Sequence, residues 1–225
     1  MRVIGHKGAA GVELGNTMAS LKSARELGVY GVEFDVRLTH DRQLVLSHDD
    51  DMIDLSGSNV SISESSLASL RKIKLKNGEV IATLREALRE LTGTLAIVDI
   101  KSDNCVLELL DVLDEFPNSR ITISTFHHHF AAELEKLRPD LHIFLAENTR
   151  PMETLRMVRT AKADGLSLNA RLLNPFNYWL ARRHNFDVMI YTLNNRFLVW
   201  FIHALYPRVA ICTDYPNRFI KPKRT

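Results

Sequence analysis

Two carboxylates alternate with apolar residues in the segment YGVEFDVRLT, residues 30–39. Residues two apart in a β-strand point to the same face, so Glu33 and Asp35 are expected to face one place. Two buried carboxylates repel each other and lose their hydration, which is costly unless positive charge lies between them. The pattern therefore predicts either basic side chains or a metal cation beside this pair.

A second segment, LAIVDIKS, repeats the spacing with Asp99 and Lys101. The three carboxylates Glu33, Asp35 and Asp99 would come from neighbouring strands and form a ligand set made only of oxygen. Such ligands suit a hard divalent cation, and we predict Mg²⁺ or Ca²⁺. Lys101 would lie on the same face as Asp99 and contact a substrate phosphate.

Two histidines follow other apolar runs. His6 and Lys7 come directly after the first run, RVIG, and His48 follows LVLS. A pair of histidines can act as acid and base near neutral pH. We predict His6 and His48 as the catalytic pair, and Lys7 as a second substrate-binding residue. Six more polar residues occupy later strand ends: Ser124, Glu147, Asn169, Thr192, Asn194 and Asp214.

Each of these residues also has a structural interpretation. Glu33 and Asp35 could pair with Arg or Lys inside the protein, and Asp99 could pair with Lys101. His6 could be a hydrogen-bonded loop residue, and His48 part of a polar turn. The run FHHHF, residues 126–130, resembles a metal cluster. Consecutive residues on a helix point in different directions, so we predict a helix N-terminus there, with adventitious metal affinity at most.

Elements that would position these residues alternate along the chain. Strand-like runs fall at 2–5, 31–37, 95–100, 120–124, 142–146, 164–168, 187–192 and 209–212. Helical patterns fall at 17–27, 83–91, 103–115, 128–137, 151–162, 175–184 and 195–205. Eight strands alternating with helices predict a (β/α)₈ TIM barrel, whose catalytic groups lie at the carboxyl ends of the strands. A doubly wound open sheet is the alternative, but no G-x-G-x-x-G follows the first strand.

One stretch interrupts the alternation. Residues 42–81 hold a short strand at 43–47 and are rich in Ser and Asp. We predict an insertion after the second strand that covers part of the barrel mouth. Without a visible linker or repeat, residues 1–225 are expected to form a single domain.

Composition limits the function classes. The 29 basic and 27 acidic residues give a net charge of only +2, so nothing predicts a nucleic-acid partner. The N-terminus lacks the apolar core of a signal peptide, and no apolar run approaches the roughly 18 residues of a membrane span. The two cysteines are too few for a disulfide framework. We expect a cytoplasmic protein without stable membrane insertion that acts on a small molecule; the oligomeric state stays open.

The ordered motifs resemble the glycerophosphodiester phosphodiesterase family over nearly the whole chain. The segments that carry the resemblance are GHKGAAGVELGNT, GVEFDVRLTHDRQLVLSHD, IATLREAL, LAIVDIK, ITISTF, MIYTLNN and ICTDYP. The resemblance implies a barrel with a small insertion, His6 and His48 as acid and base, and Glu33, Asp35 and Asp99 as metal ligands. It also implies hydrolysis of glycerophosphodiesters to glycerol 3-phosphate and an alcohol.

Three residues depart from the family pattern. Lys7 replaces an Arg, Gly15 replaces a Glu, and Asp99 replaces a Glu. An Asp followed by Lys101 is similar to the spider-venom phospholipase D enzymes, which act on choline-headed lipids. Two alternatives therefore stay open: a phospholipase D-like enzyme acting on lipid headgroups, and a barrel that binds phosphodiesters without cutting them.

Overall fold

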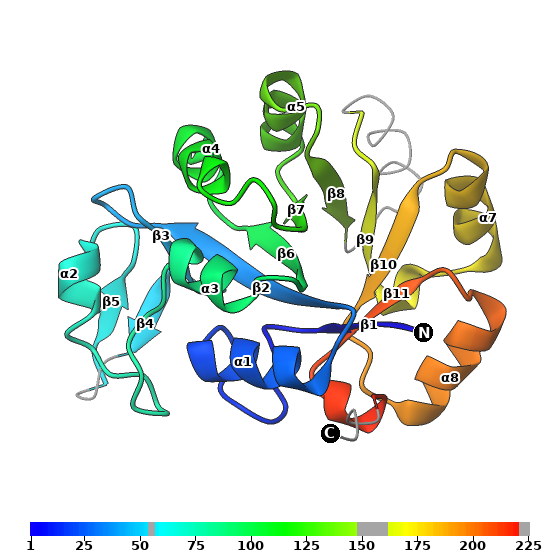
Figure 1. Cartoon of the computed structure of the whole chain (residues 1–225), viewed down its shortest axis with the longest axis horizontal. Coiled ribbons are helices and arrows are strands. Elements are labelled where there is room, and N and C mark those ends of the chain that lie inside the picture. Colours follow the sequence, from blue (N-terminus) through cyan, green and yellow to red (C-terminus); the bar gives the residue numbers. More distant parts are fainter. Residues whose placement is uncertain (54–56, 148–161, 221–225) are drawn as a thin grey trace.

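Eight parallel strands close into a barrel in the computed structural model, which describes residues 1–53, 57–147 and 162–220 (Figure 1). The barrel strands are β1 (Arg2–Gly5), β2 (Gly31–Leu38), β6 (Leu95–Ile100), β7 (Ile121–Thr125), β8 (His142–Glu147), β9 (Gly165–Asn169), β10 (Asp187–Tyr191) and β11 (Ala210–Thr213). Closure comes from β1, which pairs in parallel with both β2 and β11. The predicted TIM barrel is confirmed, and the open doubly wound sheet is excluded because neither β1 nor β11 is an edge.

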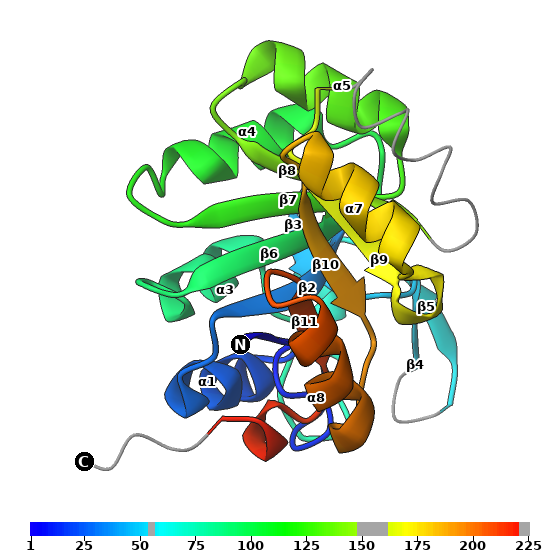
Figure 2. The ribbon, with the colours of Figure 1, turned by 90° about the vertical axis from the view of Figure 1, so that its right-hand side faces the viewer.

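Helices cover the outside of the barrel (Figures 1 and 2). They are α1 (Met18–Leu27), α3 (Leu84–Glu90), α4 (Val106–Asp114), α5 (His128–Leu137), α7 (Pro175–Arg183) and α8 (Arg196–Leu205). Short 3₁₀ turns follow β9 (η1, Ala170–Leu172) and β11 (η2, Pro216–Arg218). Six of the seven predicted helices are confirmed, and the expected helix at 151–162 lies outside the described residues except for its last position.

Local sequence explains where these helices start. The side-chain oxygens of Thr17 and Thr83 cap α1 and α3. The backbone N–H of each threonine donates in turn to the side chain three residues on, Ser20 or Glu86, which completes two capping boxes. Asn174 caps α7 and is followed by a proline in the first turn, as its sequence predicts.

The barrel interior changes from apolar to polar along the strands. Its lower part is filled by a small cluster of buried residues: Ile4, Ile97, Phe144, Met189, Ala210 and Cys212. Above this cluster, towards the carboxyl ends, the buried side chains include Glu33, Asp35, Asp99, Ser124 and Ser167. The apolar cluster therefore lies beneath a polar mouth at the carboxyl ends of the strands.

The insertion has a small core of its own. β3 (Leu44–Leu46) pairs antiparallel with the end of β2, and β4 (Asp51–Ile53) pairs with β5 (Asn59–Ser61) before the short helix α2 (Leu67–Leu70). Its buried residues are Val45, Met52, Ile62, Leu70 and Ile81. Figure 1 shows this unit beside the end of β2. No helix in the described part of the chain is long and apolar enough to span a membrane.

Candidate active site

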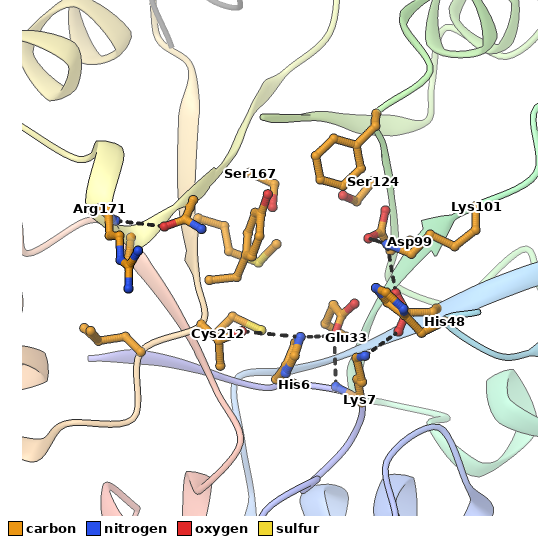
Figure 3. A pocket seen from close by; sticks show the side chains of 18 of the residues that line it. His6, Lys7, Glu33, His48, Asp99, Lys101, Ser124, Ser167, Arg171 and Cys212 are labelled. Carbon is orange, nitrogen blue, oxygen red and sulfur yellow. Dashed lines mark hydrogen bonds and ion pairs between the residues drawn. The ribbon is translucent and has the colours of Figure 1, made fainter. Parts of the chain in front are cut away.

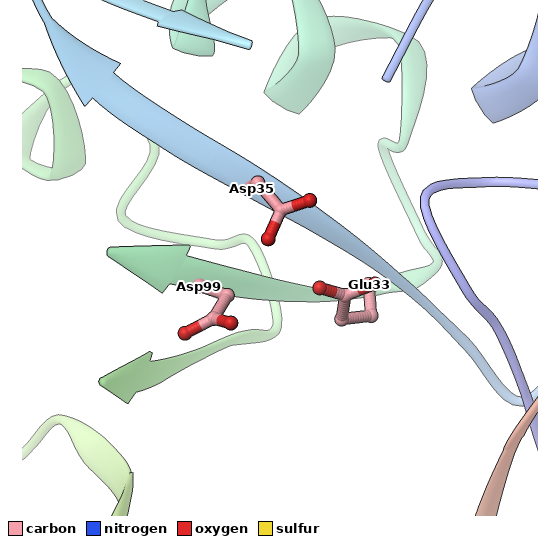
Figure 4. A group of neighbouring side chains, drawn as sticks. All are labelled: Glu33, Asp35 and Asp99. Atoms are coloured by element: carbon pink, nitrogen blue, oxygen red, sulfur yellow. The ribbon is translucent and has the colours of Figure 1, made fainter. Parts of the chain in front are cut away.

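Strand register brings the three predicted carboxylates together. Asp35 on β2 is paired directly with Asp99 on β6, and Glu33 lies two residues earlier on the same face of β2. One oxygen from each carboxylate lies within 4.8 Å of the others, and all three side chains are buried (Figure 4). These oxygens therefore have the proximity that a common cation requires.

Electrostatics in this cluster favour an added positive charge. Burial and the nearby charge of Asp35 raise the pKa of Glu33 to about 7. Burial also raises the pKa of Asp99. The Oδ1 atom of Asp99 is buried and has no hydrogen-bond partner among the described residues. Destabilised carboxylates and an unsatisfied oxygen fit a hard divalent cation.

Two lysines supply part of the missing charge. The Nζ atom of Lys101 lies 2.7 Å from Asp99 Oδ2 and 3.0 Å from Asp35 Oδ1, and Lys7 Nζ lies 3.6 Å from Asp35 Oδ2. Burial opposes ionisation of Asp35, but Lys101, a hydrogen bond from Asn16 and Lys7 together lower its pKa. The alternative interpretation, pairing with basic residues, thus holds for Asp35 and Asp99, whereas no lysine among the described residues pairs with Glu33.

The loop after β1 wraps around Glu33. The backbone N–H of Lys7 donates to Glu33 Oε2 at 2.9 Å, and that of Gly8 donates to the Glu33 carbonyl at 3.0 Å. A side chain at Gly15 would approach Lys7 Cβ to 3.0 Å. The two departures at positions 7 and 15 are therefore in contact, since the stem of Lys7 occupies the space beside Gly15.

His6 is held by a partner that the sequence analysis recorded only as a polar strand end. Its Nδ1 atom lies 2.6 Å from Asp214 Oδ1, and Asn194 donates to the other Asp214 oxygen at 2.6 Å. Burial lowers the pKa of His6, but Glu33 and Asp214 outweigh burial and raise it above the ordinary value. Asp214 therefore fixes the imidazole and leaves Nε2 facing the site, 4.0 Å from Glu33 Oε2.

His48 lies at the rim. Its side chain is 48% exposed, and Nδ1 lies 2.8 Å from Asp49 Oδ1. Arg37 holds the backbone by donating to the His48 carbonyl at 2.9 Å. The polar turn predicted as an alternative is thus present, and it orients His48 towards the same cavity as His6 (Figure 3).

All seven predicted site residues line one cavity of about 890 Å³ at the carboxyl ends of the strands. Its other walls are Ser124, Phe126, Ser167, Asn169, Ala170, Arg171, Met189, Tyr191, Thr192, Leu193, Leu198, Ile202 and Cys212. Figure 3 shows Asp99, Lys101 and His48 on one side of the cavity and Arg171 on the other, and the ring centroid of Phe126 lies 5.4 Å from Lys101 Nζ. The cavity therefore suits a small anionic molecule with a less polar end.

The FHHHF run behaves as predicted. The helix α5 begins at His128, and the adjacent residues His127 and His129 both approach Asp103, at 3.8 and 3.4 Å. Among the described residues, the carboxylate trio is the group of three or more metal-ligating side chains whose atoms converge, and these histidines do not form one. The run is a helix start with an exposed acid beside it.

Comparison with known proteins shows the family of the chain. The model of the "Glycerophosphoryl diester phosphodiesterase family" matches residues 6–218. A glycerophosphodiester phosphodiesterase from Caldanaerobacter subterraneus subsp. tengcongensis is 30% identical over 192 residues, which cover 78% of this chain and 76% of that protein. The human lysophospholipase D GDPD1 is 32% identical over 120 residues, which are 53% of this chain but 34% of that protein.

A solved structure has the same fold. The phosphodiesterase OLEI02445 of Oleispira antarctica, in complex with its product sn-glycerol-3-phosphate, superposes with a TM-score of 0.90 and 21% identity, covering 97% of this chain and 94% of that one. The family match spans the barrel from His6 to Arg218, the last residue of η2. The chain belongs to the glycerophosphoryl diester phosphodiesterase family, whose members are phosphodiester hydrolases.

Proposed function

We propose that this enzyme hydrolyses glycerophosphodiesters to glycerol 3-phosphate and an alcohol by two-histidine acid–base catalysis beside a divalent cation. The observation that carries the proposal is the convergence of Glu33, Asp35 and Asp99 within 4.8 Å of one another in the cavity that His6 and His48 line. Family membership supplies the reaction class, and the cavity supplies the residues.

Glu33, Asp35 and Asp99 would hold the cation, which we propose is Mg²⁺ or Ca²⁺ because all the donors are oxygens. The buried Oδ1 atom of Asp99 has no partner among the described residues, which supports this assignment. When bound, such an ion supplies positive charge that stabilises negative charge on the phosphate. Lys101 and Lys7 add further positive charge at the same side of the cavity, where they would bind phosphate oxygens.

The proton transfers fall to the histidines. Because Asp214 accepts the hydrogen bond of His6 Nδ1, the Nε2 atom faces the cavity, with Thr192 Oγ1 3.5 Å away, and takes the proton of the attacking hydroxyl as the new P–O bond forms. The P–O bond to the alcohol then breaks, and His48 protonates the departing oxygen through Nε2, since Nδ1 faces Asp49. The attacking hydroxyl belongs either to water or to the substrate's own glycerol, and the latter would give a cyclic phosphate first.

A second candidate is release of a headgroup from lysophospholipids. The apolar side chains of Leu198 and Ile202 line the cavity and offer a surface for an acyl chain, and one relative is named a lysophospholipase D. Parallel assays with glycerophosphocholine and lysophosphatidylcholine discriminate between the two substrates.

The buried free thiols of Cys105 and Cys212 support a reducing compartment, so we also propose a cytoplasmic location.

The test is release of glycerol 3-phosphate by His6→Ala, His48→Ala and the matched control His40→Ala, which changes an exposed histidine away from the cavity. We expect each of the first two variants to lose at least about a hundredfold in turnover while keeping the native circular dichroism spectrum. The control should retain full activity. Chelation should abolish turnover, and Mg²⁺ or Ca²⁺ should restore it. Binding of glycerophosphodiesters without any turnover in the presence of metal would instead indicate a binding barrel.

A further inference from the structure

Helix α8 is apolar at eight of its ten positions, all but Arg196 and His203, but it is largely unburied. Of its ten residues, all described, only Val199 is buried. Its exposed large apolar residues are Phe197, Leu198, Trp200, Phe201 and Leu205, and Phe197 is 75% exposed. A helix with so few polar residues normally has most of its surface buried inside a protein or at a membrane. Within the described part of the chain, the outer side of α8 therefore lacks the covering that its composition predicts.

Helix α7 extends this apolar surface. Phe176 and Trp179 are both more than half exposed, and their rings stack with centroids 6.4 Å apart. Tyr178 contacts Tyr206 edge to face, which joins α7 to the end of α8. Both helices face the viewer in Figure 2. We call the set Phe176, Trp179, Phe197, Leu198, Trp200, Phe201 and Leu205 the aromatic face.

Charge around the aromatic face is one-sided. Between residues 165 and 213 the chain has one acid, Asp187, and five arginines: Arg171, Arg182, Arg183, Arg196 and Arg208. Asp187 is already paired with Arg2 and His142, which lie near the opposite end of the barrel. Arg183 lies over the ring of Trp179. The two helices that carry the exposed aromatic rings therefore have arginines but no acidic residue, as in helices that lie on anionic bilayers.

We propose that the aromatic face docks the enzyme on the surface of an anionic lipid bilayer. A second copy of the chain is the other obvious occupant, but a twofold pairing would bring arginines towards arginines with no acid on α7 or α8 to balance them. Anionic headgroups supply that balance, and the aromatic rings enter the interface between headgroups and acyl chains. This docking is peripheral and requires no membrane-spanning helix.

The position of α8 connects this surface to the active site. Leu198 belongs to the aromatic face and also lines the catalytic cavity, together with Ile202 from the next turn. A bilayer at the aromatic face would therefore touch one edge of the mouth. The inference does not depend on the proposed reaction, because docking is measurable without turnover.

The experiment uses the two tryptophans that the chain contains, Trp179 and Trp200, both on the aromatic face. The full chain is mixed with vesicles of phosphatidylcholine alone or with phosphatidylglycerol added. We expect a blue shift of tryptophan emission and co-sedimentation only with the mixed vesicles, both weakened by salt. The double variant Phe197→Ser/Phe201→Ser should bind at least about tenfold more weakly.

Two further variants keep the result interpretable. Arg183→Glu/Arg196→Glu leaves the apolar residues in place and should also lose vesicle binding. The control Leu107→Ser removes a side chain that is 68% exposed on α4 and should bind as the wild type does. All variants should keep native circular dichroism spectra and normal turnover of a water-soluble glycerophosphodiester, which separates docking from catalysis.

Two outcomes would overturn the proposal. One is wild-type protein that neither shifts nor sediments with the mixed vesicles. The other is a wild-type dimer in solution that Phe197→Ser/Phe201→Ser converts to a monomer without any vesicle binding, which would assign the aromatic face to a second copy of the chain.

Discussion

The two halves of the barrel wall differ in how far their side chains are buried. Around β1, β2 and β6 the mouth holds buried charges, and α1 packs on the wall through Ser20, Leu21 and Ala24. Around β10 the helix α8 buries one residue and leaves its aromatic rings exposed. The difference indicates that the two halves have different roles. Catalysis needs side chains held in place by close packing, whereas docking needs apolar surface that stays accessible.

The largest effect should follow from a change in the charged half of the barrel wall, the part around β1, β2 and β6. We expect Asp99→Asn to lower turnover by more than about a hundredfold, because changes around metal ligands alone cost 10–100-fold. The fold should persist, since burial already makes the Asp99 charge unfavourable and the amide has the same shape. Steady-state kinetics with a metal titration measures the loss.

Asp103→Asn is the matched control, because it changes an exposed acid that lies beyond the end of the same strand. Full activity is expected for this variant. Wild-type turnover in Asp99→Asn would show that Asp99 takes no part in catalysis. The buried charges around β1, β2 and β6 would then have a structural role only.

A smaller loss should follow from Asp214→Asn, which removes the group that orients His6. Turnover should fall by about 10–100-fold, as for other residues that position a catalytic group. Asp214 raises the pKa of His6, so its removal lowers that pKa. Because His6 acts as a base only when neutral, the acidic limb of the pH–rate profile should move to lower pH.

The pH profile separates this role from a structural one. Asp187→Asn, at the other end of the barrel, should leave the acidic limb where it is, although it also removes a carboxylate from a histidine. An unmoved limb in Asp214→Asn would indicate that His6 is not the base.

Sequence periodicity was sufficient to predict the barrel but not which of its surfaces are exposed. Apolar runs identify all eight strands, because a strand buried on both sides is continuously apolar. The spacing of Glu33, Asp35 and Asp99 was enough to predict their convergence, since register follows from parallel pairing. These predictions depend on local patterns that the fold has little freedom to change.

Other features depend on contacts between distant residues. Asp214 meets His6 across 208 positions of sequence, so only its place at a strand end could have indicated it. The pairing of Lys101 with Asp99 was expected from their spacing, but its contact with Asp35 on the neighbouring strand depends on side-chain geometry. The exposure of α8 also could not be predicted from periodicity, because it depends on how loosely the helix packs on the barrel.

The smallest expected effect comes from removing one helix N-cap in each half of the barrel wall. Thr17 caps α1, and Asn195 caps α8. Thr17→Ala should lower the free energy of unfolding by about 1–2 kcal/mol, the usual cost of a lost cap. Asn195→Ala should cost only about half of that or less, because α8 can fray at its start while the barrel stays folded. Urea denaturation of both variants measures the difference. Equal losses would show that α8 is as firmly coupled to the barrel as α1, and would remove the contrast between the two halves.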